Sequence, residues 1–590
     1  MARAVLYGIG VSTGIAIGNG FVMGTPKAKV RHELIPLSEV ENETSRMQEA
    51  IDKVALDFEK ARNCLPDDLS LHAEMIDSYL LICKDPNLAG EALRRIREQR
   101  MNAEWALEES VACLAEAFSR LPSLYIRDRI EDVRIISDRI AQALNSNTPP
   151  AAIGEEKGIV LAYDLSPADV IGLSTGHMES FVTECGGKTS HTGILARSLH
   201  IPAIVGAVGL CRQMRPGELL IVDAFRSKVL LGPNEAEVEE YLALREEHEQ
   251  YQKRIHVLSS CPAESEDGQR VTVLANIESS REAEDVIRAG GEGVGLVRTE
   301  FGYMARAAMP DEAELAEEYT RLARRMHPRK VTFRTLDVGA GKNIVGRKAP
   351  DEPNPALGLR AIRYCLRHQD ILRTQLRAIL RASAFGNVAL MFPLISGLSE
   401  LRQAKSILNE AMQELDAVKI PFDKNLPVGI MVELPSAVFM ADMLAREVDF
   451  FSIGSNDLIQ YSLGVDRGNS HVSYLHQPLH PAIIRAIKQV VDMAHKSGIS
   501  VCVCGEMAAD PYCLPILLGM QIDELSLAPQ SIPAVKHLVR RSAGRECREL
   551  LDYALGASTA RSIIDMLRQT MFSRFPEDVA FFISQQDGNL

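Results

Sequence analysis

The 590-residue sequence has no apolar run long enough to cross a bilayer, and it has no excess of positive charge. The first absence predicts that no segment inserts into a membrane, because a helical span needs roughly 20 consecutive apolar residues. Lysine and arginine number 65 against 79 aspartates and glutamates, which leaves a net charge of −14. Sequence-independent binding to nucleic acid depends on a basic face, so this balance argues against nucleic acid as a partner.

The sequence also lacks paired zinc-binding cysteine motifs, and its opening residues are not expected to form a signal peptide. The eleven cysteines are scattered and show no paired zinc spacing, so we interpret them as reduced thiols. The opening residues 1–23 are mildly apolar but contain five glycines, which favours strands and turns over the apolar centre of a signal peptide. Both features predict a cytoplasmic protein.

A chain of this length is too long for one core and predicts several domains. Short strand patterns at both ends of the first 232 residues flank a stretch of long, charged amphipathic helices. We predict an α/β domain built from residues 1–24 and 147–232, with residues 25–146 inserted as a helical subdomain. One long charged helix in residues 233–261 is predicted to link this part to the remainder of the chain.

Residues 262–590 alternate eight short strand patterns with amphipathic helical stretches. The strand patterns are VTVLANI, GVGLVRTE, KVTFRTLDV, NVALMFPLI, PVGIMVELP, FFSIGSNDL, SVCVCGEM and ELSLAP. Eight strand–helix units in this length predict a (β/α)₈ barrel of the TIM type, with an open doubly wound sheet as the alternative. The predicted fold class is therefore a multidomain α/β protein.

Charged and polar residues gather where the predicted barrel strands end, which is where barrels of this type place their active sites. These residues are Arg298, Glu300, Arg334, Asp337, Glu433, Asn456, Asp457, Cys504 and Glu506. Their convergence on one rim would form an anion-binding mouth that also holds a cation.

Three arginines and two carboxylates carry most of this expectation. The guanidinium groups of Arg298, Arg334 and Arg467 suit the bidentate binding of carboxylate or phosphate. Glu433 and Asp457 supply the hard oxygen ligands that Mg²⁺ takes together with substrate oxygens and water. The alternative for both groups is an ordinary network of salt bridges at the barrel rim.

Cys502 and Cys504 lie on one face of a strand because side chains alternate along it. They have no second cysteine pair, which argues against zinc. A buried, inert thiol is the alternative for each, and we accept it for Cys502. Cys504 stands at the strand end beside Glu506, which suits a proton donor to a carbanion.

His191 follows a glycine pair and a hydroxyl-rich turn in GGKTSHTGILARSLHIPAIVG, at a predicted helix start. A neutral imidazole is a nucleophile toward phosphorus, and a helix N-terminus favours the anion that would form there. A solvated or capping histidine is the alternative.

Several long segments together resemble enzyme I of the bacterial phosphotransferase system, and they occur in family order. They are GIGVSTGIAIG, GGKTSHTGILARSLHIPAIVG, GVGLVRTEF, FRTLDVG, GIMVELPSA, FFSIGSNDLIQYSLGVDRGN and VCVCGEMA. The resemblance runs through nearly the entire chain. It implies a barrel that binds phosphoenolpyruvate and Mg²⁺, and a swivelling α/β domain that carries a phosphorylated histidine. It also implies an HPr-like carrier docked on the helical subdomain, and a homodimer formed through the barrel.

The resemblance also implies residue roles. His191 would accept the phosphoryl group, and Cys504 would protonate enolpyruvate. The implied substrate contacts are Arg298, Arg334, Asn456, Asp457 and Arg467, and the implied metal ligands are Glu433 and Asp457.

The sequence departs from the family pattern at several positions. Val170 stands where many relatives have threonine, and Tyr79 and Lys84 stand on the helices that the family uses for its carrier, so a divergent carrier is expected. Ala356, Leu359 and Gly341 are further departures near the substrate segments.

Pyruvate phosphate dikinase and phosphoenolpyruvate synthase share the histidine and the barrel, but they need an ATP-binding domain for which the sequence carries no signature. A regulatory protein that lost catalysis is the other alternative, and the complete set of predicted site residues argues against it.

Overall fold

The computed structural model describes residues 3–578, except 24–30, 64–69, 120–123, 146–157, 166, 175–177, 188–190, 200, 216, 305–308, 340–351, 353, 468 and 470. The chain divides into two compact units, and the boundary falls between Gln250 and Tyr251. Each unit has hydrophobic clusters of its own. None of the helices among the described residues combines the length and apolarity needed to span a bilayer.

The first unit contains an eight-stranded mixed sheet in the order β1-β8-β7-β3-β4-β5-β6-β2. Its strands are β1 (Ala4–Tyr7), β2 (Ile9–Ser12), β3 (Ile15–Met23), β4 (Gly158–Ala162), β5 (Met178–Thr183), β6 (Ala203–Val205), β7 (Leu219–Asp223) and β8 (Lys228–Leu231). Strands β3, β4, β5 and β6 pair parallel with one another in this order. The pairings of β7 with β3, β8 with β7, β1 with β8 and β2 with β6 are antiparallel. Because β3 pairs with both β4 and β7, the start of the chain and the segment after residue 157 form one sheet.

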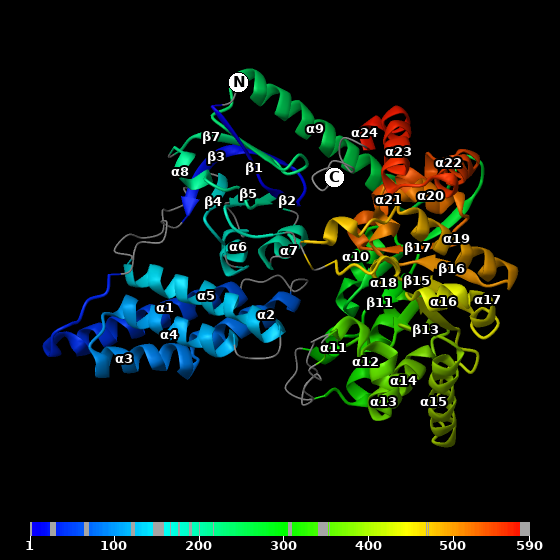
Figure 1. Ribbon diagram of the computed structural model, residues 1–590, viewed down its shortest axis with the longest axis horizontal. Helices are drawn as coiled ribbons and strands as arrows, with labels where there is room; N and C mark the ends of the chain where they lie inside the picture. The colour runs from blue at the N-terminus through cyan, green and yellow to red at the C-terminus, as the bar shows by residue number, and fades with distance from the viewer. Residues whose placement is uncertain are drawn as a thin grey trace. The chain divides into compact units, whose positions relative to one another are not determined.

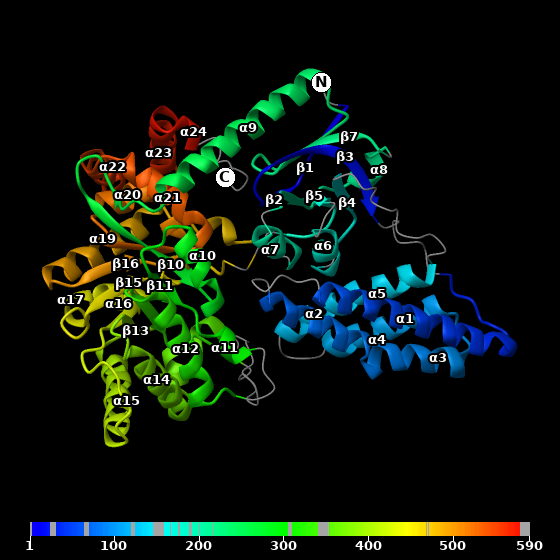
Figure 2. The same cartoon turned by 180° about the vertical axis from the view of Figure 1, so that it is seen from behind.

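Among the described residues, three α-helices belong to this α/β part, and five α-helices belong to the insertion between β3 and β4. The first group is α6 (Pro167–Ser174), α7 (His191–Ser198) and α8 (Leu210–Gln213). The second is α1 (Val40–Asn63), α2 (Ser70–Cys83), α3 (Glu91–Gln99), α4 (Ala103–Ser119) and α5 (Leu124–Asn145), which lie side by side in Figures 1 and 2. Buried side chains from both groups share one hydrophobic cluster, and the predicted helical insertion in an α/β domain is confirmed.

The second unit is a closed barrel of eight parallel strands. They are β10 (Arg270–Ile277), β11 (Val294–Val297), β12 (Val331–Arg334), β13 (Val388–Phe392), β14 (Val428–Val432), β15 (Phe450–Ile453), β16 (Ser500–Val503) and β17 (Glu524–Leu527). Strand β17 pairs with β10, which closes the ring, so the alternative of an open sheet is wrong. The two-residue strand β9 (Ala263–Glu264) pairs antiparallel with β10.

Helices surround the barrel strands in Figures 1 and 2. They are α10 (Ala283–Arg288), α11 (Phe301–Met304), α12 (Glu312–Met326), α13 (Ala361–Arg367), α14 (Gln369–Ser383), α15 (Leu398–Ala417), α16 (Pro435–Phe439), α17 (Ala441–Leu444), α18 (Ser455–Leu463), α19 (Pro481–Lys496), α20 (Cys513–Gly519), α21 (Ile532–Arg540), α22 (Gly544–Gly556), α23 (Ala560–Arg574) and α24 (Pro576–Asp578).

The barrel has two hydrophobic layers because its strands are covered on both faces. One layer fills the space between the strands and the surrounding helices. The other is a small cluster made of Leu296, Ala389, Met391, Met431, Phe450, Cys502 and Cys504. The second cluster comes from alternate residues of several strands, which is the arrangement of side chains inside a barrel of this type.

The predicted connecting helix is present as α9 (Glu235–Leu258). Its last turns belong to the barrel unit, where the Tyr251 hydroxyl donates to Asp578 Oδ1 at 2.8 Å. Asp578 is fully buried and also accepts a hydrogen bond from Arg541 at 2.6 Å. Through these two hydrogen bonds, Asp578 of α24 holds the end of α9 against the end of α21.

Candidate functional site

Arg334 is the charged residue at the end of β12. Its Nη2 donates to Glu300 Oε1 at 2.8 Å, and its Nη1 lies 3.1 Å from Asp337 Oδ2. Burial opposes the charged form, but these two carboxylates outweigh it and raise the pKa of Arg334, so the group stays cationic. The buried Nε of Arg334 has no hydrogen-bond acceptor among the described residues.

Arg360 joins this network from the segment that leads into α13. Its Nη2 donates to Asp337 Oδ1 and to Asp457 Oδ2, each at 3.0 Å. Its Nη1 donates to the Tyr461 hydroxyl at 3.0 Å. Arg360 is not among the residues predicted from the sequence, where its signal is its place at the end of NPALGLR beside Leu359.

Glu433 follows β14 and is buried within the same network, with an exposed fraction of 3%. Its Oε2 accepts the backbone N–H of Leu394 at 2.9 Å. Burial, together with the negative charges of Asp337 and Asp457, raises the pKa of Glu433 to about 8. Gly454 makes room for this side chain, because a Cβ there would lie 2.7 Å from Glu433 Cγ.

Asn456 and Asp457 begin α18, directly after β15. The Asn456 side chain donates to Glu506 Oε1 at 3.0 Å and accepts from the Glu506 backbone N–H at 3.1 Å. This reciprocal pair connects the ends of β15 and β16. Asp457 accepts a hydrogen bond from Arg360, which also contacts Asp337, so Asp457 belongs to the ionic network that contains Arg334.

Cys504 follows β16 and is 4% exposed. Its Sγ donates to the Ile453 carbonyl at 3.5 Å. Burial raises the pKa of the Cys504 thiol to about 11, so it is protonated at neutral pH. Cys502 is also buried, and burial raises its pKa as well. The predicted placement of both thiols on one face is confirmed, because both lie in the cluster inside the barrel.

The two remaining predicted arginines are more exposed. Arg298 donates to Glu278 Oε1 at 3.3 Å, with 44% of its side chain exposed. Arg467 follows α18, and its backbone N–H donates to Gln460 Oε1 at 3.3 Å. In the part of the chain that the structure describes, no hydrogen bond or ion pair links the Arg467 guanidinium to the network of Arg334 and Arg360.

His191 is the first residue of α7, as the sequence predicted, although its side chain is outside the described part of the structure. The next residue, Thr192, is buried and donates to the Leu165 carbonyl at 2.7 Å. Val170 of α6 is fully buried in the core shared with the helical insertion. The turn that contains Thr189 and Ser190 also lies outside the described residues.

The expectation that Tyr79 belongs to a carrier-binding surface is wrong. Tyr79 is 1% exposed, its ring centroid lies 5.5 Å from that of Phe58, and its hydroxyl is 3.5 Å from Asp132 Oδ1. It therefore belongs to the core of the helical insertion. Lys84 is exposed, as expected for a surface position, and lies 3.5 Å from Glu59.

No group of three histidine, cysteine, aspartate or glutamate side chains arranged as metal ligands occurs among the described residues. Glu433 and Asp457 offer two carboxylates, and Mg²⁺ binding at this place stays a prediction.

Gly341 and Leu359 are two of the departures from the family pattern near the predicted substrate segments. Gly341 lies outside the described residues. Leu359 donates its N–H to Glu352 Oε1 at 3.0 Å.

Three family models match the chain, and all describe enzymes that use phosphoenolpyruvate. The model for the N-terminal domain of these enzymes matches residues 7–129, and the model for the mobile domain matches residues 154–227. The model for the phosphoenolpyruvate-binding domain matches residues 252–543, which include the whole network around Arg334. The fold and the site thus define a phosphoenolpyruvate-utilising enzyme.

Curated relatives narrow this class. A phosphoenolpyruvate-protein phosphotransferase from Priestia megaterium is 39% identical over 96% of this chain and 99% of the relative. A protein of the same name from Bacillus subtilis (strain 168) is also 39% identical, with the same coverage. The chain therefore belongs to the phosphoenolpyruvate-protein phosphotransferase family. A solved structure titled as an NMR solution structure of Enzyme I (nEIt) is 31% identical and covers 41% of this chain and 99% of that one, with a TM-score of 0.36.

Proposed function

We propose that this enzyme transfers the phosphoryl group of phosphoenolpyruvate to its own His191 and then to a histidine of an HPr-like carrier protein, releasing pyruvate. This reaction is the first step of a sugar phosphotransferase system or of a regulatory branch of it. The names of the relatives support the donor and the protein acceptor.

The observation that carries the proposal is the buried ionic network at the ends of the barrel strands. Arg334 and Arg360 each contact Asp337, and Arg360 also contacts Asp457. A substrate with a phosphate and a carboxylate needs two fixed cationic forks, which these arginines supply. Arg298, Asn456 and Arg467 complete the proposed set of substrate contacts.

In the proposed transfer, a ring nitrogen of neutral His191 attacks phosphorus while the bond between phosphorus and the enol oxygen breaks. The enolate of pyruvate leaves with that electron pair, and the arginines stabilise the charge that spreads over the phosphoryl oxygens. The helix start at His191 favours the phosphorylated product because the first N–H groups of α7 have no partners within the helix.

We propose that Cys504 supplies the proton that converts the enolate into pyruvate. Its S–H donates a proton to the methylene carbon of the enolate, and the resulting thiolate is reprotonated from solvent. The buried, protonated state of this thiol at neutral pH supports the assignment.

The carboxylates of Glu433 and Asp457 offer the hard oxygen ligands that Mg²⁺ takes. Burial raises the pKa of Glu433, and the negative charges of Asp337 and Asp457 raise it further, a repulsion that a divalent cation would relieve. Bound there, the ion would neutralise charge on the transferring phosphoryl group.

We further propose that residues 25–146 bind the carrier and that residues 1–24 and 147–232 form a mobile phosphohistidine domain. Residues 233–261 would be the linker, and residues 262–590 would bind phosphoenolpyruvate and form a homodimer. We also propose that the protein is cytoplasmic.

Labelled phosphoenolpyruvate and Mg²⁺ without ATP test the proposal directly. We expect acid-labile label on the wild-type protein and none on His191→Ala, which should still bind phosphoenolpyruvate at the barrel. An HPr-like protein added afterwards should remove the label. A wild-type protein that acquires no label would favour a regulatory protein without catalysis, and label on His191→Ala would rule out His191 as the acceptor.

A further inference from the structure

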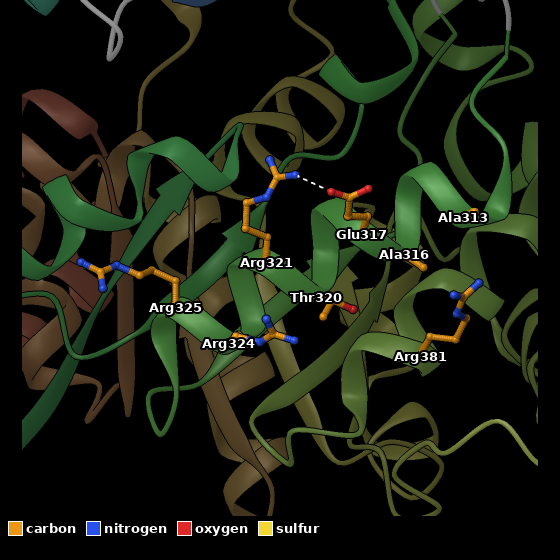
Figure 3. Close-up of a pocket in the computed structure, with 8 residues that line it drawn as sticks. All are labelled: Ala313, Ala316, Glu317, Thr320, Arg321, Arg324, Arg325 and Arg381. Atoms are coloured by element: carbon orange, nitrogen blue, oxygen red, sulfur yellow. Dashed lines mark hydrogen bonds and ion pairs between the residues drawn. The ribbon is translucent and has the colours of Figure 1, made fainter.

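A cavity of about 740 Å³ lies against α12, outside the network at the strand ends. It is lined by residues of α12 and by Arg381 of α14 (Figure 3). Cavities of roughly 300–1,000 Å³ accommodate small-molecule ligands. Neither the ionic network around Arg334 nor any residue proposed to act in phosphoryl transfer lines it.

The sequence of α12 explains why there is room for a cavity. Leu315, Tyr319 and Leu322 are buried and pack α12 against the barrel. Ala313 and Thr320, seven residues apart, lie on another face of the helix and carry short side chains that line the cavity. Longer side chains at these positions would occupy the space.

The lining of the cavity is strongly cationic for a protein whose net charge is −14. It contains four arginines, Arg321, Arg324, Arg325 and Arg381, and one glutamate, Glu317. Figure 3 shows Thr320 between the guanidinium groups of Arg324 and Arg381, whereas Arg325 points away from Arg381.

Three of these arginines have carboxylate partners. Arg321 lies 3.0 Å from Glu317, Arg381 lies 3.0 Å from Glu312, and Arg325 pairs with Glu284. Such pairs on a partly exposed surface contribute little stability, so an anionic ligand can compete for the same guanidinium groups.

Arg324 differs from the other three. Within the part of the chain that the structure describes, no carboxylate pairs with it, and its Cζ lies 5.4 Å from the centre of the Phe385 ring. A cation–π contact with the face of an aromatic ring positions a guanidinium group but leaves its N–H donors without hydrogen-bond acceptors. Arg324 is thus a positioned cation whose donors are available to the cavity.

We propose that this cavity binds a small anion that carries at least two phosphate or carboxylate groups. Arg324 and Arg381 bind the acidic groups with their planar forks, and the Thr320 hydroxyl donates a further hydrogen bond. Arg321 lies one helical turn from Arg324, about 5 Å along the axis, and it binds a second acidic group after leaving Glu317. The ligand site is separate from the phosphoenolpyruvate site and does not depend on the proposed reaction.

Hydrogen–deuterium exchange of the full-length protein with pyrophosphate tests this site, because the readout is local. The experiment uses Mg²⁺-free buffer at constant ionic strength, since the arginines at the strand ends also attract pyrophosphate. We expect slower exchange in residues 312–326 and a saturable dependence on pyrophosphate. Inorganic phosphate, with a single acidic group, should need a concentration at least about tenfold higher for the same protection.

The variant Arg324→Lys tests whether binding requires the planar geometry of the guanidinium group or only its positive charge. Lysine keeps the positive charge but lacks the planar fork. We therefore expect half-maximal protection of residues 312–326 to need a pyrophosphate concentration about tenfold higher than in the wild type. Arg288→Lys is the matched control, because Arg288 is exposed on α10 and forms its ion pair with the nearby Asp285 at 3.1 Å. Unchanged exchange in residues 312–326, or equal affinity in Arg324→Lys and the wild type, would overturn the proposal. Citrate distinguishes a carboxylate ligand from a phosphate ligand by its relative affinity.

Discussion

Arg360 donates a hydrogen bond of 3.0 Å to Asp457, a residue 97 positions further along the chain. The same nitrogen donates to Asp337 at the end of β12. One guanidinium group thus joins two carboxylates from separate strand ends, and its charge limits the repulsion between them. The contact also places a cation beside Asp457, one of the two residues that we propose as Mg²⁺ ligands.

Replacement of Arg360 by lysine should impair phosphorylation more than it impairs folding. A lysine keeps one positive charge but lacks the planar fork that directs four hydrogen bonds from Arg360 to Asp337, Asp457 and Tyr461. We expect the rate of phosphorylation by phosphoenolpyruvate to fall by about 100-fold. Rapid-quench measurement of phosphoprotein gives this rate, and the exposed Arg288→Lys serves as the control. A rate within twofold of the wild type would exclude Arg360 from the substrate site.

The two buried cysteines should respond differently to replacement by serine. Cys504→Ser removes the proposed proton donor, since a serine hydroxyl is a much weaker acid than a thiol. We expect slow formation of pyruvate by this variant, while His191 still accepts the phosphoryl group, because that transfer needs no proton. Cys502→Ser should cause only a modest packing defect. Single-turnover measurement of phosphoprotein and pyruvate compares the two, and wild-type pyruvate release by Cys504→Ser would remove the assignment.

Glu433 should make the stability of the protein depend on pH when Mg²⁺ is absent. Its folded-state pKa of about 8 lies above that of an unfolded glutamate, so the folded state holds a proton that the unfolded state has lost. The free energy of unfolding therefore falls as pH rises from about 4.5 to about 8. Glu433→Gln cannot lose this proton and should be more stable than the wild type at pH 8 by on the order of 1–3 kcal/mol.

Urea unfolding of both proteins between pH 5 and pH 8 measures this difference. Mg²⁺ should stabilise the wild type at the upper end of this range and should have less effect on Glu433→Gln. A difference between the two proteins that does not change with pH would contradict the raised pKa.

Tyr79 should contribute to stability and not to contact with the carrier. Tyr79→Ala removes a buried ring that packs on Phe58, so we expect a loss of about 3–5 kcal/mol in unfolding of the N-terminal unit. Tyr79→Phe should lose at most about 1 kcal/mol, because the hydroxyl lies a long 3.5 Å from Asp132.

Lys84→Ala is the matched surface variant on the same helical insertion, with 64% of its side chain exposed. It should unfold like the wild type and should change the rate of phosphoryl transfer to an HPr-like carrier if the carrier docks near it. A stable Tyr79→Ala protein with a selective loss of that transfer would show that Tyr79 is a contact residue after all.

Local patterns predicted the barrel strands and many of the residues at their ends. The strands are short, largely apolar runs, and several of them end at or close to a charged or polar residue, a pattern that depends only on neighbours in the sequence. For this reason Arg334, Glu433, Asn456, Asp457 and Cys504 could be placed at strand ends before the fold was known. The connecting helix α9 was predicted for the same reason, because its charged residues and its length are local properties.

Tertiary structure alone decided the places of Arg360 and Tyr79. The part of Arg360 in the site depends on the path that brings the start of α13 to Asp337 and Asp457, and no local pattern encodes that path. The orientation of α2 decides which of its faces is buried, and the buried face contains Tyr79. The pKa values of Glu433 and Cys504 also follow from burial and from charges distant in the sequence, so only the folded chain could determine them.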